Sequence, residues 1–121
     1  MEASIRHTIG QTYATLGVLN SAQTHLVRAY EIRRRILGTE NKDTIDSMSR
    51  LGSCYQAQGM SGKAEPLLRQ AFESGKRVLG EADPMVFLAA SDLGVVYFEL
   101  SEFDKADSIY QGILEVAYRV K

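Results

Sequence analysis

The sequence contains a single cysteine, carries almost no net charge and has no long hydrophobic run. Cys54 alone can form neither an internal disulfide nor a cluster of metal thiolates, a composition that suits a reducing compartment. Fourteen basic and fifteen acidic residues give a formal charge of -1, which provides no attraction for nucleic acid or an anionic membrane surface. No run approaches the roughly 18 apolar residues that cross a bilayer, and the polar stretch after Met1 is unlike a signal peptide. We therefore expect a cytoplasmic protein that binds neither nucleic acid nor membrane.

Motifs for catalysis and cofactor binding are equally scarce. The two histidines, His7 and His25, fall on different expected helices, far from any serine or cysteine in a recognisable catalytic motif. The sequence has no phosphate-binding loop, zinc-ligand spacing or dinucleotide fingerprint. We expect no enzyme activity, cofactor or metal, with His25 in a structural role and Cys54 as a small buried filler. His7 is the histidine that could contact a ligand.

What the sequence does contain is an internal repeat. Tyr13, Tyr55 and Tyr97 are spaced 42 residues apart, and each has a glycine three residues before it and an alanine nine residues after it. A fixed period of roughly 20 to 50 residues is typical of proteins built from stacked structural units. We therefore predict one domain over residues 1–121, with repeats at about 1–42, 43–84 and 85–121.

Apolar residues within each repeat follow helical spacing, as in Ile45, Met48 and Leu51. Gly17 and Gly59 can end the first helices in the left-handed conformation. Asp83 followed by Pro84 is typical of a helix start, and Asp43 or Thr44, Asn20 or Ser21, Ser61 and Asp104 are the other candidate N-caps. The sequence predicts an all-α fold with helices over 2–16, 21–37, 44–58, 62–79, 85–100 and 104–120.

The middle repeat carries a specific resemblance in its Leu51, Gly52, Tyr55, Gly59, Ala64, Leu68 and Ala71. This pattern resembles the tetratricopeptide repeat of the 42-residue kind found in kinesin light chains. The first repeat matches it throughout, and the third departs only at Ser101 and Ile113. The resemblance implies an α-solenoid of three helix-turn-helix repeats, with about six antiparallel helices in a right-handed superhelix. It also implies that Tyr55 packs between neighbouring helices, where its hydroxyl can reach a polar partner.

The resemblance further implies that the first helix of each repeat lines a concave groove that binds a peptide or protein. Short polar side chains in this groove would hydrogen-bond an extended backbone, and the third repeat adds an apolar patch. The positions carried over are Ser4, His7, Thr8, Gln11 and Ala14, then Asp46, Ser49, Arg50, Ser53 and Gln56, then Leu88, Ser91, Asp92, Val95, Phe98 and Glu99. The lysines, arginines and asparagines of a carboxylate-gripping groove are mostly absent from these positions.

Two further features leave alternatives open. Residues 109–120 are apolar over most of the last helix, which predicts contact with further repeats or with a second copy of the chain. Similar repeat arrays accompany bacterial Ser/Thr protein kinases and signalling ATPases, so a regulatory segment of such an enzyme is the alternative to a free-standing scaffold. The consecutive Arg33, Arg34 and Arg35 are spread over about 200° of a helix, which favours a solvated outer face over a phosphate-binding patch.

Overall fold

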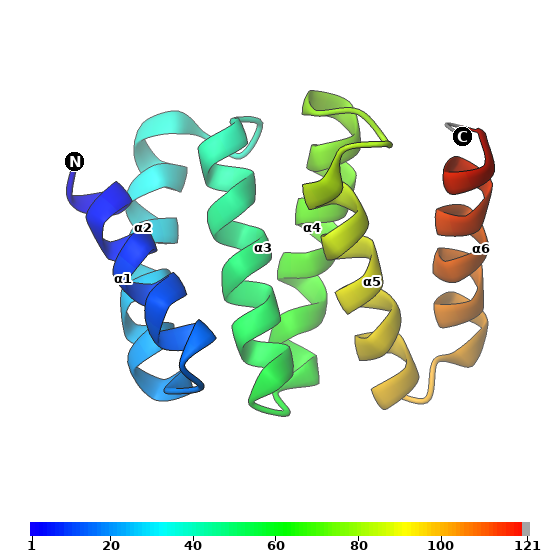
Figure 1. Ribbon diagram of the computed structural model, residues 1–121, viewed down its shortest axis with the longest axis horizontal. Helices are drawn as coiled ribbons and strands as arrows, with labels where there is room; N and C mark the ends of the chain where they lie inside the picture. Colours follow the sequence, from blue (N-terminus) through cyan, green and yellow to red (C-terminus); the bar gives the residue numbers. More distant parts are fainter. Residues whose placement is uncertain (120–121) are drawn as a thin grey trace.

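The computed structural model describes residues 1–119 and contains six α-helices in three antiparallel pairs (Figure 1). The helices are α1 (Glu2–Thr15), α2 (Leu19–Leu37), α3 (Lys42–Ala57), α4 (Ser61–Val78), α5 (Pro84–Glu99) and α6 (Phe103–Arg119). All six helices predicted from the sequence are present, within a few residues of their expected bounds, and the described residues form no strand. The expected end of the last helix at residue 120 lies outside the described part.

Helix starts differ from the predicted caps at several points. Asn41 caps α3, in place of Asp43 or Thr44, because its side chain accepts a hydrogen bond of 2.8 Å from the backbone N–H of Asp43. Asp83 caps α5 as predicted and accepts from the N–H of Met85 at 2.8 Å.

The N-cap residues of the second helices α2 and α4 are Val18 and Met60, which lie before the predicted caps at Asn20 or Ser21 and at Ser61. Neither start has a side-chain cap. The backbone itself closes the turn, because the N–H of Met60 donates to the carbonyl oxygen of Tyr55 at 2.8 Å. In the third pair, α6 begins at Phe103, one residue before the expected cap Asp104.

The turn inside each helix pair requires a left-handed residue. Gly17 and Gly59 supply it in the first two pairs, with φ of 79° and 76°. In the third pair Ser101 occupies this position with φ of 61°, and it is the one described non-glycine residue with a positive φ. A side chain in this conformation costs about 1–2 kcal/mol, which glycine avoids.

We expect Ser101→Gly to raise the free energy of unfolding by about 1 kcal/mol, since it relieves this backbone strain. Urea denaturation followed by circular dichroism checks the result. Ser108→Gly is the matched control, because Ser108 is exposed within α6 and its replacement removes a residue with better helix propensity. An unchanged or lower stability for Ser101→Gly would contradict the strain.

Close contact within each pair explains the repeated glycine of the first helices. A Cβ built at Gly52 would lie 2.7 Å from Cγ of Leu68, and one at Gly10 would lie 2.7 Å from Cγ of Leu26. Both distances are far inside van der Waals contact, so α1 and α3 approach their partner helices only because a Cβ is missing.

The apolar core runs from one pair to the next without a break. One cluster joins α2 to α3 and includes Leu26 and Leu51, while another joins α4 to α5 and α6 and includes Leu68 and Leu93. The ring of Tyr55 packs against both clusters. The pairs are therefore held together by shared packing, as expected for a stack whose units bury their faces against neighbours.

The stack is curved, with the first helices on its inner side. In Figure 1 the helices α1, α3 and α5 follow one another across the molecule, and each contacts the next. Over residues 1–119, α2 and α4 make no comparable contact, nor do α4 and α6. A stack whose first helices touch while its second helices spread apart bends toward the first helices. None of the six helices is long and apolar enough to cross a membrane.

Candidate functional site

The inner surface of α1, α3 and α5, here called the first-helix face, carries the residues that the resemblance assigns to ligand binding. Seven of their side chains are exposed: Ser4, Thr8, Leu88, Ser91, Val95, Phe98 and Glu99. Eight are half-buried: His7, Gln11, Ala14, Asp46, Arg50, Ser53, Gln56 and Asp92. Ser49 differs from all of these because it is buried. Its side chain is therefore out of reach of a ligand, although its position in the repeat pattern is equivalent to those of His7 and Ser91.

Polar contacts run across this face from helix to helix. Nε2 of His7 on α1 lies 3.0 Å from the carboxylate of Asp46 on α3. On the other side of α3, the hydroxyl of Ser53 donates to the carboxylate of Asp92 on α5. Nε2 of Gln56 reaches Glu99 at 3.4 Å. These residues already hold neighbouring helices together, so they form a continuous polar surface.

Asp46 lies between two positively charged or donating side chains of the face, His7 and Arg50. Burial acts to raise its pKa, but the hydrogen bond from His7 and the positive charges of His7, Arg50 and Arg33 outweigh this effect. The pKa of Asp46 therefore lies below its usual value. Arg50 contributes from the same helix, with its Nε 3.5 Å from the other carboxylate oxygen. These neighbours therefore stabilise the ionised carboxylate of Asp46.

A buried arginine anchors this corner of the molecule, which corrects the expectation that Arg33 faces solvent. Arg33 is 8% exposed, whereas Arg34 and Arg35 are exposed as predicted. Its guanidinium donates to the hydroxyl of Ser47 at 2.9 Å and to the carbonyl oxygen of Asp43 at 3.2 Å. The start of α3 folds back over this side of α2, so the side chain is covered. Its role is structural, because its donors are directed at the protein's own groups.

Ser47, His7 and Asp46 form a chain that has the order of a catalytic triad. The Ser47 hydroxyl lies 3.3 Å from Nδ1 of His7, whose other nitrogen contacts Asp46. Ser47 is fully buried and accepts a hydrogen bond from Arg33, so no substrate can approach its oxygen. The arrangement therefore links α1 to α3 and does not provide a nucleophile.

The hydroxyl of Ser49, which has no hydrogen-bond partner among the described residues, shows how the three repeats differ. Its Oγ is buried and has no hydrogen-bond partner within the described residues. His7 occupies the equivalent position in the preceding repeat, where it meets the carboxylate of Asp46. The residue equivalent to Asp46 in the third repeat is Leu88, which offers no polar atom. Replacement of the carboxylate by leucine thus exchanges a polar contact between helices for exposed apolar surface.

Leu88 is part of an apolar patch on α5. The patch consists of Leu88, Val95 and Phe98, with Phe98 62% exposed. The Phe98 ring packs edge-on against Phe103 at the start of α6, with the ring centroids 5.3 Å apart. Asp92 and Glu99 lie on the same helix beside these side chains, and neither forms an ion pair with a described residue.

His25 and Cys54, for which the sequence predicts structural roles, are both packed against other side chains. His25 stacks on the ring of Tyr13 with the centroids 5.9 Å apart, which agrees with its expected structural role. Cys54 is buried in the cluster between α2 and α3, as predicted. Burial raises the pKa of its thiol, which disfavours the reactive thiolate.

Comparison with known proteins supports the repeat architecture. A sequence model for a family described as tetratricopeptide repeat matches residues 1–77. The chain belongs to the tetratricopeptide repeat family. Members of this family are typically non-catalytic modules that serve as protein–protein interaction scaffolds. No curated protein gives a significant sequence match.

Solved structures show the same tetratricopeptide architecture. BtubC (BKLC) from P. vanneervenii superposes with a TM-score of 0.88 at 20% identity, over 97% of this chain and 46% of that one. A putative kinesin light chain of Podosopora anserina with nearly identical TPR-like repeats gives 0.86 at 19% identity, over 100% of this chain and 58% of that one. The TPR domain of Arabidopsis FLU gives 0.84 at 19% identity, over 98% and 96%. The chain thus spans about half the length of the first two structures and nearly all of the third.

Proposed function

We propose that the first-helix face binds an extended segment of a partner protein, and that the chain acts as a non-catalytic scaffold in the cytoplasm. The observation that carries this proposal is the apolar patch on the inner side of the stack. Leu88, Val95 and Phe98 expose large apolar side chains beside a row of hydrogen-bonding groups. Exposed apolar side chains gathered within a polar surface are typical of interaction sites.

The charges on this face favour a partner segment with basic residues next to an apolar anchor. Asp46 already contacts His7 and Arg50, so its carboxylate is less available to a partner's cation. Asp92 and Glu99, on the same helix as Phe98, accept hydrogen bonds from neutral side chains and form no ion pair with a described residue. A lysine or arginine of the partner would meet these carboxylates while a leucine or aromatic side chain packs on Phe98.

The test uses peptides selected from a random displayed library on the wild-type chain, with affinities measured by titration calorimetry. Phe98→Ala is expected to weaken the selected peptide at least tenfold, the size expected for a central contact of roughly 1.4 kcal/mol or more. Ile36→Ala is the control, because Ile36 is also an apolar side chain that is well exposed but lies on α2. It should leave the affinity unchanged.

Charge reversal provides a second arm of the same experiment. Arg50→Glu adds a negative charge to the first-helix face, whereas Arg35→Glu makes the same change at an exposed position of α2. We expect only Arg50→Glu to alter the affinity, with a melting temperature confirming that both variants fold. Equal affinity for the wild type and all four variants would exclude the first-helix face as the binding surface.

We also propose that the outer face of α6 receives a further first helix, from additional repeats or from a second copy. Tyr110 and Leu114 are exposed there, and the equivalent residues of α2 are Leu26 and Tyr30, which pack toward α3. We expect sedimentation velocity on this chain to show concentration-dependent association that Leu114→Lys weakens. A monomer at every concentration would contradict docking of a second copy and leave only further repeats as the occupant.

A further inference from the structure

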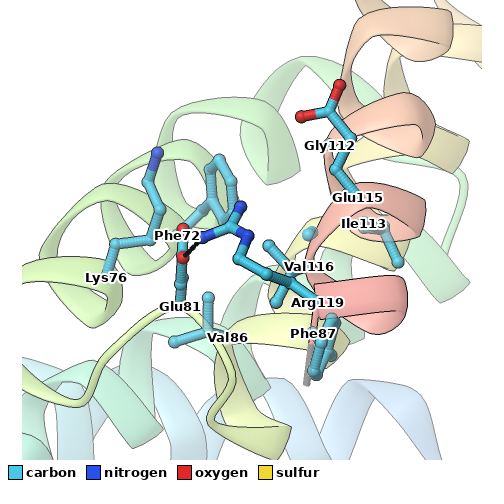
Figure 2. Close-up of a pocket in the computed structure, with 11 residues that line it drawn as sticks. Phe72, Lys76, Glu81, Val86, Phe87, Gly112, Ile113, Glu115, Val116 and Arg119 are labelled. Atoms are coloured by element: carbon cyan, nitrogen blue, oxygen red, sulfur yellow. Dashed lines mark hydrogen bonds and ion pairs between the residues drawn. The ribbon is translucent and has the colours of Figure 1, made fainter. Parts of the chain in front are cut away.

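A cavity of about 140 Å³ lies between α4, α5 and α6, on the side of the second helices (Figure 2). Its walls are mostly apolar. They comprise Phe72 from α4, Val86, Phe87 and Ala90 from α5, and Ile113 and Val116 from α6. None of these residues belongs to the first-helix face, so the cavity is a separate feature of the molecule.

Two side chains that line the cavity are smaller than their counterparts one repeat earlier, although Phe87 and Ile113 are larger than theirs, Ile45 and Ala71. Ala90 is equivalent to Met48, which fills the core between α3, α4 and α5 and is fully buried. Gly112 is equivalent to Gln70, and a Cβ built at Gly112 meets no atom within 4 Å. At these two positions the third repeat lacks side-chain volume that the second repeat has.

The polar contacts that close the equivalent region of the second repeat are also changed. There, Ser74 donates to Glu40 at 2.6 Å and accepts from Gln70 at 2.7 Å, and Arg77 reaches Glu40 at 2.8 Å. The residues equivalent to Ser74 and Glu40 are Val116 and Ala82, which cannot form these hydrogen bonds. The interior of the cavity is consequently apolar.

Charged side chains surround the mouth without making it strongly charged. Arg119 forms an ion pair with Glu81 across the opening, drawn as a dashed line in Figure 2. Nζ of Lys76 lies 4.5 Å from the centroid of the Phe72 ring, at one edge of the cavity. In Figure 2 the carboxylate of Glu115 points away from the Arg119–Glu81 pair. Arg119 is thus paired with Glu81, and Lys76 already faces the Phe72 ring. This arrangement favours a further aromatic ring over an ion.

We propose that this cavity binds one uncharged aromatic ring of a small molecule. An apolar protein cavity of about 150 Å³ takes up benzene, which shows that a volume of this size suits a single ring. The rings of Phe72 and Phe87 can pack against a bound ring edge-on or with an offset. Lys76 and Arg119 can approach its faces or edges at the mouth.

Toluene is the probe, and methyl resonances of the isotopically labelled chain are the measurement. We expect saturable shifts at Val86, Ile113 and Val116 as toluene is added. The filled variant Ala90→Met/Gly112→Gln restores the side chains of the preceding repeat and should weaken toluene at least about tenfold, with a higher melting temperature because the cavity is occupied. Gly112→Gln alone enters open space and serves if the double variant fails to fold.

Two controls separate this site from the rest of the molecule. Ala57→Met/Gly62→Gln makes the same changes at exposed positions of α3 and α4, and should bind toluene like the wild type. Phe98→Ala on the first-helix face should also bind toluene normally, so failure of either proposal leaves the other intact. Absence of saturable shifts in the wild type, or equal binding by the filled and wild-type chains, would overturn the assignment.

Discussion

Truncation of Tyr55 to alanine is expected to lower the free energy of unfolding by about 3 kcal/mol, near the lower end of the 3–5 kcal/mol typical of buried ring truncations. The ring contacts the core cluster between α2 and α3 and the cluster of α4, α5 and α6, so its loss opens both. The lower end of the range applies because the side chain is only half-buried. A small domain is stable by about 5–15 kcal/mol, so this loss is a large fraction of the total.

The measurement is urea denaturation, with Tyr55→Phe as the control. The sequence suggested that the Tyr55 hydroxyl could reach a polar partner, but it forms no hydrogen bond with a described residue, whereas Tyr97 donates to Glu65 at 2.8 Å. Tyr55→Phe should therefore change stability by less than about 0.5 kcal/mol, and Tyr97→Phe by about 1 kcal/mol or more. An unchanged midpoint for Tyr55→Ala would contradict the shared packing of the helix pairs.

Gly52→Ala is expected to cost about 1–2 kcal/mol, because the new methyl group would overlap Leu68. Overpacking of a core typically costs about 1–3 kcal/mol, and the better helix propensity of alanine returns up to about 1 kcal/mol. Leu68 is fully buried and the atoms nearest the new Cβ are its Cγ and Cδ2, at 2.7 and 2.8 Å. The leucine therefore cannot move aside without disturbing the core.

Gly94→Ala is the matched substitution and should behave differently. The new Cβ would meet the end of the Tyr110 ring at similar distances, but Tyr110 is 39% exposed and can turn outward. We expect its stability to lie within about 0.5 kcal/mol of the wild type, since a modest clash and the helix-propensity gain nearly cancel. Thermal and urea denaturation of the two variants together provide the check. Equal losses at both positions would show that the freedom of the neighbouring side chain does not decide the cost.

The architecture could be predicted from the sequence because its signals are local and repeated. Each repeat shows helical spacing, a Gly52–Tyr55-type pair and, in the first two, a left-handed glycine such as Gly59. The same signals recur at a fixed period, which strengthens the prediction. Helix starts were less accurate. The turn after Gly59 needs no side-chain cap, because backbone hydrogen bonds close it, so capping residues in the sequence predict a helix start that is too late.

Features that depend on contacts between repeats could not be predicted in this way. Arg33 is buried because α3 folds over it, which its neighbours in the sequence do not indicate. Ser49 is buried although equivalent positions are accessible, since burial here depends on the side chains of the adjacent helices. The cavity had a signal in the exchange of Met48 for Ala90 and of Gln70 for Gly112. The exchange alone does not predict the cavity, because the sequence does not show that these residues face the same space.

Methyl chemical-shift mapping of the chain with a library-selected peptide tests most directly whether the first-helix face is the binding surface. Leu88 and Val95 lie on that face, whereas Ile36 and Val78 are at least as exposed at the ends of α2 and α4. Binding on the first-helix face predicts the largest shifts at Leu88 and Val95 and none at Ile36 or Val78. Shifts concentrated at Ile36 and Val78, with Leu88 and Val95 unchanged, would contradict it.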